Sequence, residues 1–175
     1  MPTVVTPSTP PLNHILPVTL HDREGIPFLV REMSPADREI VASFYESFEP
    51  KRAAQGLPPQ GSYRIIRWLD NVLRGGTHLL VESDQGMVGH AFLAPTARPG
   101  VAEYAIFLDQ GIRGRGVGTQ VNRVAAQVAR AQGMRGLWLS VELHNRAAVR
   151  SYEKAGFRFR PSTVYGPEAE MELPL

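Results

Sequence analysis

The chain has 175 residues, of which 43% are hydrophobic, and its 19 Lys or Arg and 17 Asp or Glu give a formal net charge of +2 at pH 7. This length accommodates one compact domain with a core, since single domains usually contain about 100–200 residues. The sequence has no cysteine, which excludes disulfide bonds, thiolate metal sites and a cysteine nucleophile. It also has no run approaching the ~20 apolar residues of a membrane-spanning helix and no secretory signal at its start, so we expect a cytoplasmic protein with no membrane partner.

The charge is distributed unevenly along the chain. Residues 111–160 contain ten Arg or Lys and only two Glu, which gives this segment +8 and leaves −6 for the remainder. Such a basic segment favours a polyanionic partner, either a phosphorylated small molecule or a nucleic acid. The alternative is that these arginines only solvate helix faces, and a motif is needed to decide between the two.

The first third of the chain predicts an arm, a hairpin, a helix and a loop. Residues 1–15 are rich in proline, serine and threonine without a periodic apolar face, so we expect a flexible arm before a single domain at 16–175. Two β-prone runs around the polar turn at 21–25 predict a hairpin. Ser34-Pro35 is typical of a helix start, and apolar residues at helical spacing extend this helix to about Phe48, before a Pro- and Gly-rich loop at 49–61.

Beyond this loop the predicted elements are first a helix with three strands and then an alternation. A helix at 62–74 precedes strands at 77–82, 87–93 and 101–108, whose short connecting turns predict antiparallel neighbours. There follow a helix at 117–131, a strand at 137–143, a helix at 145–155 and strands at 157–165 and 169–173. Alternating strands and helices require crossovers and therefore some parallel pairing. We predict an α/β fold, a mixed sheet with helices on its faces.

The strongest local motif lies between a predicted strand and a predicted helix and reads Arg113-Gly114-Arg115-Gly116-Val117-Gly118-Thr119. Glycines allow a ligand to approach the backbone closely, and the free N–H groups at a helix start bind anions, to which the two arginines would add charge. The segment lacks the Gly-Lys-Ser/Thr of a Walker loop, and no acid follows at the spacing of the dinucleotide fingerprint. It therefore predicts a phosphate site of another kind.

A second motif lies about 30 residues downstream. Asn145 is placed to cap a helix, Gly156 to end it, and Tyr152 lies two turns after Asn145 on nearly the same face. Structural roles alone would also explain all three residues, with Tyr152 as a core aromatic.

In this order and spacing, the two motifs resemble the GNAT superfamily of acetyl-CoA-dependent N-acetyltransferases, over about residues 28–173. The resemblance implies a mostly antiparallel sheet with one splayed parallel strand pair, 101–108 and 137–143, and acetyl-CoA bound in the gap as co-substrate. It implies that the loop from Arg113 to Thr119 cradles the diphosphate, that Asn145 contacts the cofactor, and that Tyr152 lies near its sulfur. The backbone of Ile106, Phe107 and Leu108 would pair with the pantetheine arm.

The acetyl acceptor stays open at this stage. The hairpin and the following Ser-Pro-Ala-Asp helix look similar to the protein-lysine acetyltransferase branch, so the acceptor is a small-molecule amine or a protein lysine or N-terminus. A non-catalytic CoA-binding module is a further alternative. The basic segment lacks a Phe or Tyr platform for bases apart from Tyr152, Phe157 and Phe159, so we expect no nucleic-acid partner. We expect no metal, because the five histidines show no ligand spacing. The family often pairs subunits, and a homodimer remains an open alternative.

The chemistry requires a free amine, because a lysine-like amine with a pKa of ~10.4 is unprotonated in only about one molecule in 2,500 at pH 7. Without cysteine, direct attack in a ternary complex is favoured over an acetyl-enzyme. We expect Tyr152 to act as the acid toward the leaving thiolate, and Glu103 to act as the base through a water. The alternative for Glu103 is a strand carboxylate that moves no proton. Some relatives have a glutamate five residues before the motif asparagine, where this chain has Ser140, and Glu142 is the reserve candidate.

Overall fold

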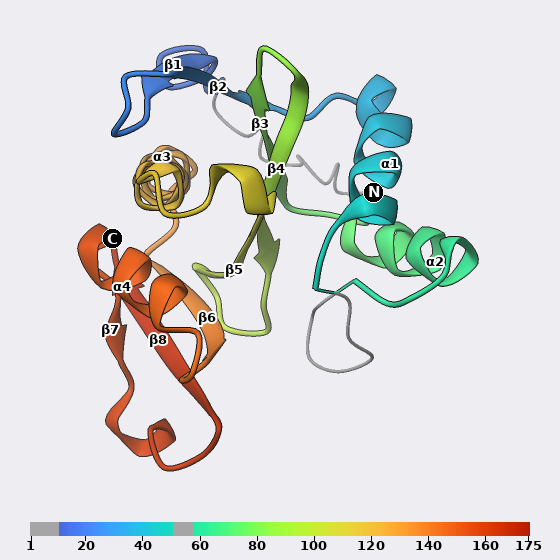
Figure 1. Ribbon diagram of the computed structural model, residues 1–175. Helices are drawn as coiled ribbons and strands as arrows, with labels where there is room; N and C mark the ends of the chain where they lie inside the picture. The colour runs from blue at the N-terminus through green and yellow to red at the C-terminus, as the bar shows by residue number, and fades with distance from the viewer. Residues whose placement is uncertain (1–10, 51–57) are drawn as a thin grey trace, which may run out of the picture.

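The computed structural model describes residues 11–50 and 58–175, which form an eight-stranded sheet with helices on both faces (Figure 1). The strands lie in the order β1-β2-β3-β4-β5-β6-β8-β7, and every pair is antiparallel except β5 and β6. The α/β class and the single parallel pair predicted from the sequence are confirmed. The strands are β1 (Val18–His21), β2 (Pro27–Glu32), β3 (Thr77–Ser83), β4 (Gly86–Pro95), β5 (Val101–Leu108), β6 (Gly136–Glu142), β7 (Arg158–Phe159) and β8 (Glu168–Pro174).

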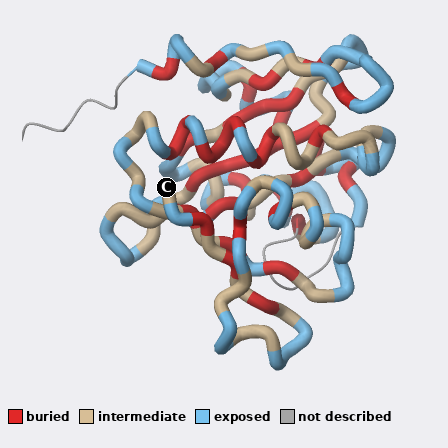
Figure 2. The backbone as a smooth tube through the Cα atoms, turned by 90° about the vertical axis from the view of Figure 1, so that its left-hand side faces the viewer, coloured by how far each residue is buried: buried red, intermediate tan, exposed pale blue. Residues whose placement is uncertain are grey.

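Two pairs of helices cover opposite faces of the sheet. The helices are α1 (Arg38–Ser47), α2 (Ser62–Val72), α3 (Val117–Ala131) and α4 (Arg146–Ala155), with short 3-10 turns η1 (Pro35–Asp37), η2 (Gln110–Ile112) and η3 (Pro161–Thr163). Helices α3 and α4 pack over the larger apolar core, whereas α1 and α2 pack over a second, aromatic one. Figure 2 shows the buried residues concentrated along the strands between these layers. Among the described residues, no helix has the length and apolar character that crossing a membrane requires.

Two boundaries differ from the predictions. The predicted strand at 157–165 contains only the two residues of β7, because Pro161 lacks the N–H that a ladder needs and starts η3. The expected arm, 1–15, lies outside the described residues up to position 10, but Leu12 is only 5% exposed and packs into the larger core. Packing therefore begins before residue 16, because Leu12 and Leu16, although surrounded by prolines, lie on the same buried side.

The parallel pair separates after three positions. Strands β5 and β6 pair only at Val101–Gly136, Ala102–Leu137 and Glu103–Trp138. Beyond Glu103, β5 continues along β4 as far as Leu108, while β6 continues along β8. The two strands therefore diverge, and within residues 11–50 and 58–175 no strand pairs with the edge of β5 that faces β6 from residue 104 to 108.

A chain of hydrogen bonds, buried at its Tyr45 end and exposed at its Gly75 end, attaches α1 to the sheet. The Tyr45 hydroxyl lies 2.6 Å from His90 Nδ1, His90 Nε2 lies 3.1 Å from His78 Nδ1, and His78 Nε2 lies 3.0 Å from the Gly75 carbonyl oxygen. Because that carbonyl only accepts, we assign the proton of His78 to Nε2, which leaves Nδ1 to accept from His90 and His90 Nδ1 to accept from Tyr45. Both rings are thus neutral and fully bonded, which is a structural role for His90.

This chain predicts a loss of stability in mild acid. Burial, aided by His78, lowers the pKa of His90 to about 3, against ~6.5 in an unfolded chain, and burial also lowers the pKa of His78. Between about pH 3 and ~6.5 the unfolded chain binds more protons than the folded protein, so the free energy of unfolding falls as the pH drops. Each such histidine lowers it by up to ~1.4 kcal/mol per pH unit. We expect His90→Gln to remove one such contribution between pH 7 and 5 in urea unfolding, while Tyr45→Phe, which keeps both rings, retains the pH slope. An unchanged slope in His90→Gln contradicts the assignment.

Candidate active site

The unpaired edge of β5 offers backbone groups to a ligand. In an antiparallel ladder the residues alternate between those bonded to the neighbouring strand and those turned away from it. The amide of Asp109 donates to the Val88 carbonyl, so the alternation turns the backbone of Phe107 toward β4 and that of Ile106 and Leu108 toward the gap beside β6. An extended chain lying in this gap would meet the Ile106 N–H and C=O groups.

Of the three residues expected to pair with pantetheine, Phe107 does not present its backbone to the gap. Its side chain is buried on the α1/α2 face, with ring centroids 5.5 Å from Tyr45 and 5.6 Å from Phe48. The expectation of three consecutive pairing residues is corrected to alternate ones, because successive peptide groups of a strand point in opposite directions. The Leu108 carbonyl is itself engaged, since it accepts from Arg113 Nε at 2.9 Å.

The loop between η2 and α3 forms a row of free amides. Gly114 and Gly116 have positive φ of 76° and 85°, a left-handed conformation that favours glycine. The first helical bond runs from Gln120 N–H to the Gly116 carbonyl. Within the described residues, the amides of 114–119 donate to no protein group, so they and the positive end of the 15-residue helix α3 are available to an anion.

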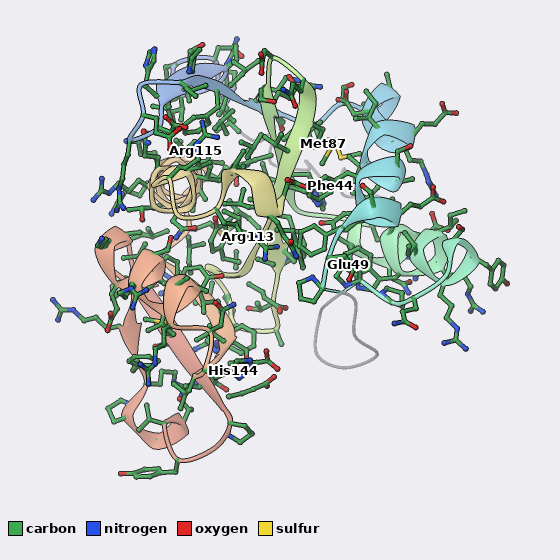
Figure 3. All side chains as sticks on the ribbon, viewed as in Figure 1. Phe44, Glu49, Met87, Arg113, Arg115 and His144 are labelled. Atoms are coloured by element: carbon green, nitrogen blue, oxygen red, sulfur yellow. The ribbon has the colours of Figure 1, made fainter. Side chains whose placement is uncertain are left out.

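The side chains of the two loop arginines are occupied inside the protein. Arg113 donates to the carbonyls of Leu108 and Glu49, at 2.9 and 3.0 Å, and lies 5.6 Å over the Phe48 ring. Arg115 donates to Asp22 Oδ2 at 2.6 Å. Figure 3 shows Arg113 between its loop and the end of α1, and Arg115 beside the β1–β2 turn. The charge that we expected these arginines to add to the anion site is therefore bound by other partners, and the loop offers chiefly its backbone.

Asp22 is matched to Arg115. Its burial would raise the pKa of the carboxyl, but hydrogen bonds from the amide of Ile26, from Arg115 and from the amide of Glu24 outweigh burial and lower it. Asp22 is therefore ionised at neutral pH and holds the Arg115 charge.

A polar network below the loop, which the sequence did not reveal, joins α3, α4 and β5. Asn122 is fully buried; its Oδ1 accepts from the Tyr104 hydroxyl at 2.8 Å and its Nδ2 donates to Ser151 Oγ at 3.1 Å. Thr119 Oγ1 also donates to Ser151 Oγ, at 3.4 Å. A methyl group on Gly118 would lie 3.1 Å from that same oxygen, so glycine allows α4 to approach α3 closely. The one available signal was an asparagine on the apolar stripe of the predicted helix.

Helix α4 places Asn145 and Tyr152 as its pattern predicted. The Asn145 side chain caps the helix by accepting from the Ala148 amide at 3.2 Å, and Gly156, with φ of 103°, ends it. The Tyr152 ring is 8% exposed and packs edge-on against Tyr104, with centroids 6.4 Å apart. Burial raises the pKa of Tyr152 to about 12. Its hydroxyl forms no hydrogen bond with the described residues, whereas the Tyr104 hydroxyl donates to Asn122.

The two acid–base candidates lie on opposite faces of the sheet. Tyr152 lies over the α3/α4 face, as do Tyr104 and Ile106 of β5. Glu103 alternates with them and shares the α1/α2 face with Phe107, at the last position where β5 still pairs with β6. Glu142, the reserve candidate, lies on β6 with Nε2 of the exposed His144 3.4 Å from its carboxylate.

Comparison with known proteins identifies this arrangement. The model of the Acetyltransferase (GNAT) family matches residues 39–157, from α1 through the end of α4. The chain belongs to this family. The resemblance found in the sequence is confirmed, and this GNAT protein is an acyltransferase that uses acetyl-CoA as co-substrate.

Related proteins align with most of this GNAT protein. The chain is 30% identical to an L-methionine sulfoximine/L-methionine sulfone acetyltransferase of Pseudomonas aeruginosa over 136 residues, and the alignment covers 73% of this chain and 78% of that protein. The GNAT domain of S. lividans PAT superposes with a TM-score of 0.75 at 21% identity, covering 93% of this chain and 98% of that one. Spermidine N-acetyltransferase from Vibrio cholerae, solved with CoA and spermine, superposes with a TM-score of 0.64 at 14% identity over 84% and 95% of the two chains.

The residues of this GNAT site fit acetyl-CoA. A diphosphate needs several N–H donors, which the free amides of 114–119 supply. A methyl group on Gly114 would have no atom within 4 Å, so the backbone there is open to a ligand. The amide-containing pantetheine arm needs an unpaired strand edge, which β5 supplies at Ile106.

Proposed function

We propose that this enzyme transfers an acetyl group from acetyl-CoA to the primary amine of a small molecule, by direct attack of the amine within a ternary complex. The observation that carries the proposal is the row of amides at 114–119, which donate to no group among the described residues, together with the β5 edge that β6 leaves unpaired. Tyr152 lies on α4 next to Ser151, whose Oγ contacts this loop at Gly118 and Thr119. The relative from Pseudomonas aeruginosa, whose name gives methionine sulfoximine and methionine sulfone as substrates, supports a small-molecule acceptor.

We assign the binding of the co-substrate mainly to the backbone. The amides of 114–119 hold the diphosphate, Ile106 and the free N–H of Leu108 bond the pantetheine arm, and Asn145 keeps α4 in place by capping it.

Proton movements divide between the two faces of the sheet. Tyr152 donates a hydrogen bond, and finally its proton, to the thiolate that leaves on the α3/α4 face. With a pKa of about 12 it remains protonated at neutral pH and so is ready as a donor. Glu103, on the opposite face, accepts the first proton of the incoming ammonium through a water. The attacking nitrogen loses its second proton to solvent as the C–S bond breaks, and the Tyr152 phenolate regains its proton from solvent. This separation lets the amine enter from one side and the thiol leave on the other.

The charge on the acceptor face favours a cationic amine. Across β6 and β8 this face carries Glu142, Glu168, Glu170 and Glu172 in register with Trp138 and Ser140. Hydrogen bonding from Trp138, against the opposing effect of burial, and pairing with Arg160 lower the pKa of Glu170, so this carboxylate is ionised. Arg98 and Arg160 form ion pairs with Glu170 and Glu172, so the four carboxylates of this face still outnumber the two guanidinium groups paired with them. We expect an ammonium ion to be drawn to this surface, where Glu103 then deprotonates it.

The proposal is tested by two measurements on the full chain. Isothermal titration with acetyl-CoA should show binding, and a panel of amines should release CoA thiol. The panel contains L-methionine sulfoximine, L-methionine sulfone, spermidine and a lysine-containing peptide. Release with the small amines is the expected result. Release with the peptide alone moves the acceptor to protein lysine, binding without release indicates a non-catalytic CoA-binding module, and no binding at millimolar acetyl-CoA refutes the proposal.

The base assignment predicts a pH-dependent defect. We expect Glu103→Gln to lower kcat roughly 10- to 100-fold at pH 7, because the variant loses the proton acceptor. The defect should shrink toward pH 9.5, where the free amine is about 300 times more abundant than at pH 7. Initial rates over this range test it, with Glu142→Gln measured in parallel. If Glu142→Gln has the defect and Glu103→Gln does not, the base is Glu142.

A further inference from the structure

We propose that Arg23, in the turn between β1 and β2, binds the diphosphate of acetyl-CoA and supplies the positive charge that the arginines of the 113–119 loop do not. This inference rests on the proposed function, because it requires the diphosphate to lie on the amides of that loop. It assigns a binding role to a residue 90 positions before the loop and outside the segment matched by the family model, 39–157.

The β1–β2 turn is attached to the loop by backbone and side-chain bonds. The Arg23 amide donates to the Arg115 carbonyl at 2.9 Å, and the turn's Asp22 accepts from Arg115 Nε at 2.6 Å. Gln120, in the first turn of α3, donates to the His21 carbonyl at 2.8 Å. These three bonds fix the turn next to the start of α3, so the position of Arg23 relative to the amides is set by the fold.

The Arg23 side chain lies directly on the anion loop. A methyl group placed on Gly116 would be 3.2 Å from Arg23 Nε and 3.3 Å from Arg23 Cγ. Gly116 immediately precedes α3, whose first N–H groups are undonated. The Arg23 guanidinium therefore lies beside Gly116, whose amide belongs to the proposed diphosphate site.

Arg23 is also available, in contrast to the loop arginines. Arg113 is held by two carbonyls and Arg115 by Asp22, as described above. In the part of the chain that the structure describes, the exposed Arg23 side chain has neither a hydrogen bond nor an ion pair. A guanidinium matches two phosphate oxygens at once, and a free one beside undonated amides at a helix start completes an anion site. The Asp22–Arg115 pair thus holds the β1–β2 turn against the loop and so positions Arg23 beside the amides.

The test is a set of acetyl donors with different phosphates, assayed with wild type, Arg23→Gln and Arg23→Lys. We expect Arg23→Gln to raise KM roughly ten-fold for both acetyl-CoA and acetyl-dephospho-CoA, with kcat unchanged, since a charge-assisted hydrogen bond is lost from binding alone. With S-acetylpantetheine, which has no phosphate, the variant and wild type should have equal kcat/KM. Arg23→Lys, which retains the charge, should recover part of the affinity. Arg130→Gln is the matched control. Arg130 is also exposed, but it lies in the last turn of α3, about 20 Å along the helix from Gly116.

Several results would overturn this role. One is an unchanged KM for acetyl-CoA in Arg23→Gln, and another is an equal defect with S-acetylpantetheine, which indicates a structural effect. A defect that disappears with acetyl-dephospho-CoA would place Arg23 on the 3′-phosphate instead. If wild type itself does not bind acetyl-CoA, the proposed function fails together with the inference, whereas normal binding by both wild type and Arg23→Gln refutes only the inference.

Discussion

Replacing Tyr152 by phenylalanine is expected to lower kcat about 100-fold while acetyl-CoA affinity and folding stability change little. The phenylalanine ring keeps the contacts with Tyr104 and Phe157. The Tyr152 hydroxyl, which phenylalanine lacks, has no hydrogen-bond partner among the described residues, so its removal leaves no protein group unsatisfied. The loss should fall on the step in which the thiolate leaves, since a positioned acid typically contributes 10²–10⁴-fold. Steady-state kinetics, titration with acetyl-CoA and thermal unfolding measure the three quantities.

Tyr104 provides the contrasting control. Its hydroxyl donates to Asn122 Oδ1 in a fully buried position, so Tyr104→Phe leaves that oxygen without its donor and should cost about 1–3 kcal/mol of unfolding free energy. The two tyrosines thus separate a chemical role from a structural one. An unchanged kcat in Tyr152→Phe removes this residue from the acid role, and a large stability loss would show that its hydroxyl is structural.

Substituting Gly114 by alanine is expected to weaken acetyl-CoA binding ten-fold or more. The new methyl group meets no atom of the described residues within 4 Å, and it extends from the loop that we assign to the diphosphate, so we expect it to collide with that group. It should cost only about 1–2 kcal/mol of stability, because φ is 76° and an L-residue is disfavoured there. Isothermal titration and urea unfolding measure the two effects separately.

Gly133 offers a matched control for this backbone strain. It has nearly the same φ, 74°, and again no atom within 4 Å of an added methyl group, but it lies after the C-terminal end of α3. Gly133→Ala should therefore destabilise the protein to a similar extent and leave acetyl-CoA affinity unchanged. Equal affinity in both variants would show that Gly114 does not line the binding site.

The sequence by itself determined the local elements and the motifs. The apolar stripe of α3, the cap at Asn145, the glycine end at Gly156 and the glycine loop before α3 all depend on neighbours within a few residues, whose conformational preferences act in any context. The order of these motifs then sufficed for the family and its co-substrate.

Only the tertiary structure decided which charges and backbone groups reach the site. Asp22 forms an ion pair with Arg115, and Arg23 contacts Gly116, which is about 90 residues away in the sequence. Asn122 forms hydrogen bonds with residues of β5 and α4. The backbone of Phe107 turns away because of its register with β4, and Glu103 and Tyr152 are separated by the sheet. These features depend on strand order and helix packing, which bring together distant residues whose pairing leaves no local pattern in the chain.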